Sequence, residues 1–328
     1  MIALLVFLYS LFALSLFLPF YTYALYPILL RVLKRRRANE GMVAPPVSVI
    51  MIGRKKEESK KKISDVKKLE YPEYEVLQAE SIQAGAKKAK HDILFFTDVE
   101  TTLDKNAVKE IVKPFADSNV GCVVGQQTCK EGNSAFWKYE NLVKALESRI
   151  GCVSGVTDSI FAIRKDCIIK VPDRIRNESF CIATLLTRSG RVIVYAPNAK
   201  TYELKKEGTN YKKHIQDAVD YWQAFFFLKT MLVPGKGSFV YISHRVMKWF
   251  VWLNMVIALI ANGLLAHSSP VMFYLFLCQV LFYVSMLIYS KCKLKWKLVG
   301  IVYYFLSLNV SYMLGFFRYL FSGVKVSA

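Results

Sequence analysis

The stretch ILFFTDVETTLDKNAVKEIVKPF, residues 93–115, determines the expected fold. Four apolar residues and a threonine lead into the acidic triplet Asp98-Val99-Glu100, and a segment with an apolar stripe follows at 106–116. A buried strand followed by an amphipathic helix is the repeating unit of an α/β sheet. Because ligands of such sheets sit outside the carboxyl ends of the strands, the triplet predicts a site for a metal ion and a phosphate.

The same alternation extends to both sides of this stretch. Apolar runs typical of buried strands occur at 47–53, 74–79 and 120–127, and segments with helical periodicity occur at 57–70 and 81–90. Continuous apolar strands that alternate with amphipathic helices favour a mostly parallel sheet covered on both faces. We therefore expect an α/β fold for the middle of the chain.

Both ends of the chain have the composition of membrane segments. Residues 1–30 contain no charged side chain, and three more apolar runs cover 249–266, 271–289 and 298–321. About 20 apolar residues are enough to cross a bilayer. The sequence thus predicts an N-terminal transmembrane anchor (1–31), a globular domain (42–247) and a C-terminal membrane domain of three transmembrane helices (248–328).

Basic clusters next to the spans predict the orientation of the chain. RVLKRRR (31–37) follows the first span, and SKCKLKWK (290–297) separates the last two. Such clusters stay on the cytoplasmic side, so we expect a multi-pass protein of the cell membrane with its central domain in the cytoplasm. Arg318 and Lys325 fall near the outer end and oppose this assignment mildly.

The net charge of +20 from 45 basic and 25 acidic residues has two explanations. A basic protein can bind nucleic acid, but here many of the basic residues lie beside membrane spans, where an anionic lipid surface is the better partner. We therefore expect the lipid bilayer as a partner, and no nucleic acid. The four histidines do not cluster and no C-x-x-C pair occurs, so no zinc site is expected.

Five segments of the middle domain carry a resemblance to a known family. They are PPVSVIMIG (45–53), YPEYEV (71–76), AGAKKAKHDILFFTDVETTLDKNAVKEIVKPFADSNVGCVVG (84–125), WKYENLVKALESRIGCVSGVTDSIFAIRKD (137–166) and ESFCIATLLTRSGRVIVYAPNAKTYE (178–203). They resemble the membrane-integrated family 2 glycosyltransferases, which make cellulose, chitin, hyaluronan and related polymers. This resemblance implies a GT-A fold with a Rossmann-like sheet, a nucleotide-sugar donor and a bound Mg²⁺ or Mn²⁺.

The resemblance assigns roles to individual residues. Asp98 and Glu100 correspond to the metal-binding Asp-x-Asp motif, and Ser179 stands where the family has its catalytic base. Three further residues correspond to substrate-binding positions: Glu147, Gly155 and Gln216.

The sequence departs from the family pattern at four places. The metal motif has Glu100 as its second acid, and the turn after the first strand reads IGRKKE (52–57) where a polar, acidic turn is usual. The nucleotide-binding loop after the second strand is deleted, and only about a dozen residues separate Ala79 from Asp92. The base triplet reads Asn177-Glu178-Ser179, and Gln216 lacks the Arg and Trp that normally follow it.

These departures leave two functional hypotheses. The first is a pseudo-glycosyltransferase, a scaffold or regulatory subunit in surface polysaccharide or glycolipid synthesis that partners an active glycosyltransferase or a second copy of itself. The second is a divergent active transferase that uses a nucleotide sugar and a divalent metal, with Glu178 as a substitute base beside the usual position. The first hypothesis is preferred, because all four changes affect one reaction.

Overall fold

The structure, a computed structural model, describes residues 2–36, 41, 44–53, 56–129, 135–203, 211–292 and 297–322. The chain divides into two compact units. The sheet unit comprises Leu30–Gly208 and Leu228–Tyr241, and the helical unit comprises Met1–Leu29, Thr209–Phe227 and Ile242–Ala328.

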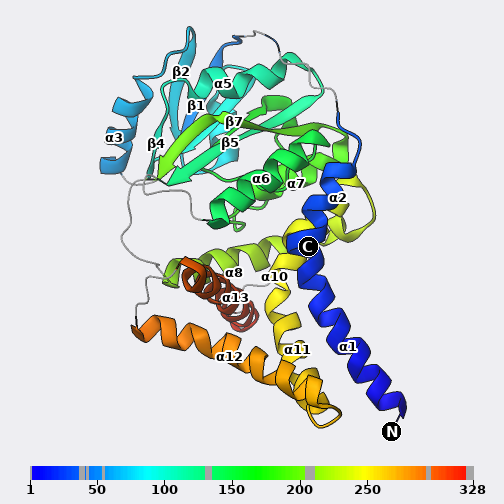
Figure 1. The fold of residues 1–328 in the computed structure, drawn as a ribbon. Helices are drawn as coiled ribbons and strands as arrows, with labels where there is room; N and C mark the ends of the chain where they lie inside the picture. Colours follow the sequence, from blue (N-terminus) through cyan, green and yellow to red (C-terminus); the bar gives the residue numbers. More distant parts are fainter. Residues whose placement is uncertain are drawn as a thin grey trace. The chain divides into compact units, whose positions relative to one another are not determined.

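The described part of the sheet unit is built on a seven-stranded sheet with the order β2-β1-β3-β6-β5-β7-β4 (Figure 1). The strands expected at 47–53, 74–79, 92–98 and 120–127 are confirmed as β1, β2, β3 and β5. The bounds are β1 (Val47–Ile52), β2 (Tyr74–Ala79), β3 (Ile93–Asp98), β4 (Thr101–Leu103), β5 (Val120–Cys129), β6 (Ile160–Arg164) and β7 (Val192–Glu203).

The sheet is mixed rather than mostly parallel. β1 runs parallel to β2 and β3, and β5 runs parallel to β7. β6 runs antiparallel to both of its neighbours, β3 and β5, and β4 runs antiparallel to β7. Strand direction could not be predicted from the sequence, because a strand buried on both faces is apolar whichever way it runs.

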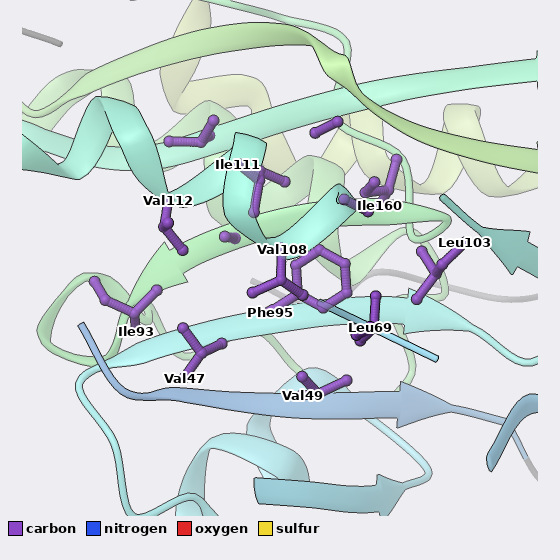
Figure 2. Close-up of a cluster of buried hydrophobic side chains, with 14 of the residues drawn as sticks. Val47, Val49, Leu69, Ile93, Phe95, Leu103, Val108, Ile111, Val112 and Ile160 are labelled. Atoms are coloured by element: carbon purple, nitrogen blue, oxygen red, sulfur yellow. The ribbon is translucent and has the colours of Figure 1, made fainter. Parts of the chain in front are cut away.

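Helices cover both faces of the sheet, as expected. On one face, Val49 and Phe95 pack with Val108 and Ile111 in the core shown in Figure 2. On the other face, a Cβ atom on Gly85 would lie 2.6 Å from Ile50 Cγ2, so a helix packs closely there. The helices of this unit are α3 (Lys56–Val66), α4 (Ile82–Lys88), α5 (Ala107–Val112), α6 (Ala135–Arg149), α7 (Glu178–Leu186) and α9 (Lys236–Val240).

The connection between β2 and β3 is short. It contains the seven-residue helix α4 and no further strand, so β2 is an edge strand. Between Tyr74 and Asp98 the chain thus forms no additional strand. The deletion of a nucleotide-binding loop here stays a prediction.

The helical unit packs through aromatic residues and one close backbone approach. Trp222 of α8 is 1% exposed, and its Nε1 donates to the Tyr312 carbonyl at 2.9 Å. A Cβ on Gly315 would lie only 2.6 Å from Ala218 Cβ, so glycine is needed where α8 meets α13. Helix α8 therefore groups with the apolar helices, although the sequence analysis placed it in the middle domain. The bounds are α1 (Ile2–Phe20), α8 (Tyr211–Phe227), α10 (Met247–Trp249), α11 (Val251–Leu265), α12 (Pro270–Cys292) and α13 (Lys297–Phe321), and α2 (Tyr26–Val32) crosses into the sheet unit.

Two described helices are long and apolar enough to cross a membrane, Ile2–Val32 and Val299–Phe321. They match the first and last of the four spans expected from the sequence. The pair Lys236–Trp249 and Val251–Leu265 meets the same criterion only as one span bent by 56°, and Pro270–Ser285 is a shorter apolar helix. Length and composition therefore fit association with a membrane at both ends of the chain.

Burial in the sheet predicts a difference between two valines that are register partners. Val49 is fully buried, whereas Val76 beside it on β2 is 38% exposed. Val49→Ala should destabilise the protein by about 2 kcal/mol through the lost packing, and Val76→Ala by at most about 0.5 kcal/mol. Chemical unfolding of the detergent-solubilised protein measures both. Equal losses would show that β1 does not form the buried centre of this sheet.

Candidate functional site

Three parallel strands end in one row. Ala79 of β2, Ile52 of β1 and Asp98 of β3 are aligned by the register of the sheet. The ladder continues one residue further, because the Gly53 amide donates to the Ala79 carbonyl at 3.2 Å and the Val99 amide to the Ile52 carbonyl at 3.2 Å. In an open α/β sheet this edge is where ligands bind.

The acidic triplet forms a tight turn at this edge. The Glu100 amide donates to Asp98 Oδ1 at 2.9 Å, and the Thr101 hydroxyl donates to the Asp98 carbonyl at 3.1 Å. The turn also packs against the end of β1, since a Cβ atom on Gly53 would lie 2.4 Å from Val99 Cγ2. The local structure thus holds the Asp98 side chain at the sheet edge, where the sequence analysis placed it.

A buried lysine supports the turn from α3. Lys62 is 2% exposed, and its Nζ donates to the Thr101 carbonyl at 2.6 Å. Burial lowers the pKa of Lys62 to about 8, and the charges of Asp65 and Asp98 oppose that shift. Asp65 in turn accepts the Leu103 amide at 2.7 Å. No sequence pattern indicated this role, because Lys62 is one of several lysines in a charged helix.

Asp158 reaches the same edge from the segment before β6. Because β6 is antiparallel to β3, Ile160 pairs with Thr97, and the Thr97 hydroxyl donates to the Ser159 carbonyl at 3.1 Å. This register brings Asp158 to the same sheet edge as Asp98, and the two carboxyl groups are close enough for the charge of Asp98 to act on Asp158. The sequence analysis missed Asp158; its position just before an apolar strand was the available signal.

The carboxyl group of Asp158 has a hydrogen-bond partner on α7. The residue keeps part of its surface exposed, but burial of its carboxyl raises the pKa of Asp158 to about 6. A hydrogen bond from Ser179 opposes the increase, and the negative charges of Asp98 and Glu178 add to it. Ser179, the residue expected from the resemblance to stand at the base position, is therefore bonded to a carboxylate from another part of the chain.

Glu178 has a different environment from its neighbour. Its Oε2 accepts the Ile82 amide at 2.8 Å, and its Oε1 accepts the Gln83 amide at 3.0 Å. Ser81 Oγ accepts the Ala84 amide at 3.1 Å, so these side chains satisfy three amides that the start of α4 leaves unpaired. This geometry gives Glu178 a structural contact with α4 and turns its carboxylate toward that helix.

Glu147 and Gly155 lie in or beside the segment that leads to Asp158, residues 152–158. Glu147 on α6 has no exposed surface, and its carboxylate accepts the Ser154 amide at 2.9 Å and the Ser154 hydroxyl at 3.1 Å. Gly155 is buried in the same segment. These contacts fix the chain that leads to Asp158 and place the Glu147 carboxylate inside the protein.

The remaining sequence candidates belong to the helical unit or fall outside the described residues. Gln216 is on α8 in the helical unit, where its Nε2 donates to Asp220 Oδ1 at 3.0 Å. Arg54 and Lys55 of the IGRKKE turn lie outside the described residues, as do four residues of SKCKLKWK, 293–296. The sheet edge thus brings together Asp98, Asp158, Glu178 and Ser179.

The donor set at the edge suits a hard divalent cation that is shared with a ligand. No group of three or more His, Cys, Asp or Glu residues that could hold a metal ion occurs among the described residues. Mg²⁺ and Mn²⁺ favour oxygen ligands, and Mg²⁺ is often held by one or two carboxylates plus substrate phosphates. If a metal binds, the carboxylates of Asp98 and Glu100 would supply that kind of incomplete site.

Comparisons with known proteins identify the fold. No family model matches the sequence, and no curated protein matches it. Among solved structures, a mannosyltransferase from Pyrobaculum calidifontis in complex with GDP-Man and Mn²⁺ matches with a TM-score of 0.71 and 14% identity, over 95% of this chain and 99% of that one. GalNAc-T7 with UDP, GalNAc and Mn²⁺ matches with a TM-score of 0.35 over 50% of this chain, at 14% identity and over 44% of its own chain. The expected GT-A-like fold is confirmed by the first of these similarities.

The metal hypothesis predicts unequal effects of the two acids. Asp98→Asn should abolish Mn²⁺ binding, because it removes the carboxylate that the turn holds in place, and Glu100→Gln should weaken it. Asp166→Asn, at an exposed carboxylate paired with Arg191, is the control and should change nothing. Electron paramagnetic resonance of free Mn²⁺ measures binding. If Asp98→Asn and Asp166→Asn bind equally, the triplet is only a solvated strand end.

Proposed function

We propose that this chain is a membrane-anchored glycosyltransferase that moves a sugar from a nucleotide diphosphate donor to an acceptor hydroxyl, with Asp158 as the general base. The contact that carries the proposal is the hydrogen bond between Ser179 and Asp158. Ser179 stands at the family's base position and cannot accept a proton near neutral pH. Asp158 supplies a carboxylate at that place.

Asp158 meets the requirements for such a base. Part of the residue is exposed, and its neighbours are Asp98 on the donor side and Ser179 on α7. Its pKa of about 6 leaves it ionised at neutral pH, and a base whose pKa lies near the working pH is the most effective. The Ser179 hydroxyl donates to the carboxylate and orients it. This assignment replaces Glu178, whose carboxylate is held by the amides of α4.

The reaction then needs one proton transfer and one displacement. The oxygen of the acceptor hydroxyl bonds to the anomeric carbon of the sugar while Asp158 accepts the proton of that hydroxyl. The bond between the anomeric carbon and the diphosphate breaks at the same time. A divalent metal at Asp98 and Glu100, when bound, neutralises charge on the departing diphosphate. The structurally similar mannosyltransferase with GDP-Man and Mn²⁺ supports this donor class.

The membrane helices favour an acceptor at a lipid surface, as in glycolipid or surface polysaccharide synthesis. Helix Ile2–Val32 and helix Val299–Phe321 would anchor the chain, with the bent pair as a third span. The basic segments at 31–37 and 290–297 favour the cytoplasm for the sheet unit. A multi-pass cell-membrane protein with a cytoplasmic transferase unit follows.

The second candidate is the non-catalytic scaffold or regulatory subunit, paired with an active glycosyltransferase or a second copy. Two observations favour it. Only Glu80 and Ser81 separate β2 from α4, which leaves little chain to grip a nucleotide. The buried cation of Lys62 lies near Asp98, where it would compete electrostatically with a divalent metal.

A transfer assay with the full-length protein in lipid nanodiscs tests the proposal. Radiolabelled nucleotide sugars, GDP-mannose first, are supplied with Mn²⁺ and a lipid extract, and label is followed into lipid and polymer. Wild type should transfer sugar. Asp158→Asn should lower the rate at least about 100-fold without changing nucleotide affinity, whereas Glu178→Gln should keep the rate within about tenfold.

A rescue variant tests whether the activity depends on a carboxylate at this place in the site. Asp158→Asn combined with Ser179→Asp moves the carboxylate to the family's position and should restore part of the activity. Nucleotide binding by wild type without transfer to any acceptor would favour the scaffold instead. Transfer that survives Asp158→Asn but stops in Glu178→Gln would make Glu178 the base.

A further inference from the structure

A pocket of about 230 Å³ lies in the sheet unit beside the end of the first membrane helix. Its charged lining consists of Arg35, Arg36, Arg149 and Asp117. The rest of the lining is mainly apolar or aromatic and includes Val194, Tyr195 and Pro197. Three guanidinium groups against one carboxylate give the pocket a net positive charge.

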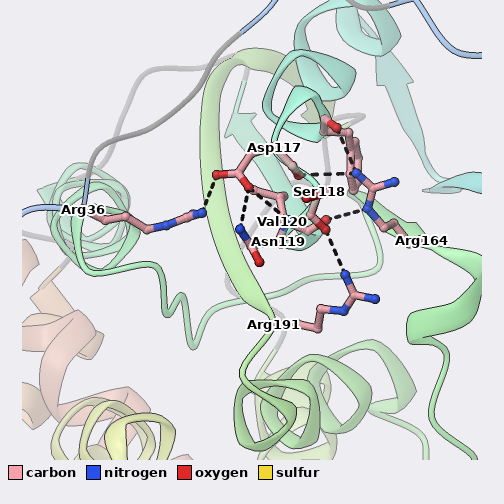
Figure 3. Close-up of polar contacts among 8 residues, drawn as sticks. Arg36, Asp117, Ser118, Asn119, Val120, Arg164 and Arg191 are labelled. Atoms are coloured by element: carbon pink, nitrogen blue, oxygen red, sulfur yellow. Dashed lines mark hydrogen bonds and ion pairs between the residues drawn. The ribbon is translucent and has the colours of Figure 1, made fainter.

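One of the three arginines, Arg36, already forms an ion pair within the protein. The partner of this ion pair is Asp117 (Figure 3). The Arg36 amide also donates to the Arg149 carbonyl at 2.7 Å. Asp117 also accepts the Asn119 amide at 2.9 Å. Although burial opposes the shift, these donors hold the pKa of Asp117 below its ordinary value, so its charge offsets Arg36.

The loop that carries Asp117 is held by further arginines. Arg164 donates to the carbonyls of Phe115 and Val120 at 2.9 and 2.8 Å, and Arg191 donates to the Ser118 carbonyl at 2.8 Å (Figure 3). One wall of the pocket is therefore fixed by hydrogen bonds rather than formed by a mobile surface chain.

Two positive charges remain in the pocket. Within the part of the chain that the structure describes, no side-chain hydrogen bond or ion pair is formed by Arg35 or Arg149. Arg149 is half-buried at the end of α6, and Arg35 is exposed. Guanidinium groups bind phosphate oxygens through paired, charge-assisted hydrogen bonds.

The pocket is close to the membrane surface along the chain. Arg36 is only four residues beyond Val32, the last residue of the candidate span Ile2–Val32. Four extended residues cover at most about 14 Å, and each headgroup region is about 5–8 Å thick. Arg36 therefore lies in the headgroup region or just outside it, if the span ends at Val32.

The pocket is separate from the carboxylate edge. β5 begins at Val120, a lining residue, and both β5 and β3 are antiparallel to β6. β5 and β3 therefore run in the same direction, so the start of β5 lies at the edge opposite to Asp98. A ligand in this pocket would not occupy the transfer site.

We propose that Arg35 and Arg149 bind the phosphate group of an anionic lipid headgroup in this pocket. The charge identifies a phosphate, and the short connection to the membrane helix identifies a lipid as its source. The bound lipid would hold the sheet unit at the bilayer surface, independently of whether the unit is catalytic.

Calorimetric titration of the full-length protein in non-ionic detergent with a short-chain phosphatidic acid tests the proposal. Binding should be saturable, and Arg35→Gln and Arg149→Gln should each weaken it about tenfold or more. The matched control is Lys34→Gln, which removes the same charge from the same segment at a residue that does not line the pocket. It should change the affinity less than twofold.

Three outcomes would overturn the proposal. If Lys34→Gln weakened lipid binding as much as the arginine variants, the lipid would be attracted by the basic segment as a whole and not by the pocket. Unchanged binding in both arginine variants would place the lipid elsewhere. Displacement of the lipid by inorganic phosphate at equal concentration would make the ligand a soluble phosphate. Arg35 is exposed and its side chain forms no hydrogen bond or ion pair within the described residues, so Arg35→Gln keeps the test valid if Arg149→Gln fails to fold.

Discussion

The antiparallel pairing of β6 with β3 is the constraint on which the candidate site depends. It aligns Ile160 with Thr97, and the bond from the Thr97 hydroxyl to the Ser159 carbonyl extends that alignment past the end of the strand. If β6 ran parallel to β3, its first residues would lie at the opposite edge of the sheet. The direction of one short strand therefore decides that Asp158 lies at the same sheet edge as Asp98.

Carboxylates gathered at one edge repel one another, and the protein gives each a different source of compensation. Lys62 supplies positive charge near Asp98, Ser179 donates to Asp158, and the amides of α4 hold Glu178. The compensation is incomplete at Asp158, whose pKa is raised. A carboxylate kept at higher energy in its ionised form accepts a proton more readily, which is the property that a base at this place requires.

The two edges of the sheet differ in charge. The carboxyl edge of the parallel strands gathers acids, whereas the opposite edge gathers Arg35, Arg36 and Arg149 around a single aspartate. This separation suits a unit that would bind a metal and a donor on one side and a phosphate on the other. Glu147 is buried inside the unit, where its carboxylate accepts the Ser154 amide.

The sequence alone determined β1, β2, β3 and β5, the apolar helices at both ends and the carboxylate at the end of β3. These features follow from local apolar periodicity and from where a buried strand stops. The tertiary structure decided the direction of β6, the partner of Ser179, the role of Lys62 and the engagement of Glu178. Each of these is a contact between segments distant in sequence, as with the bond between Gln83 and Glu178, 95 residues apart. No local pattern encodes such a contact, because it forms only when the sheet brings the segments together.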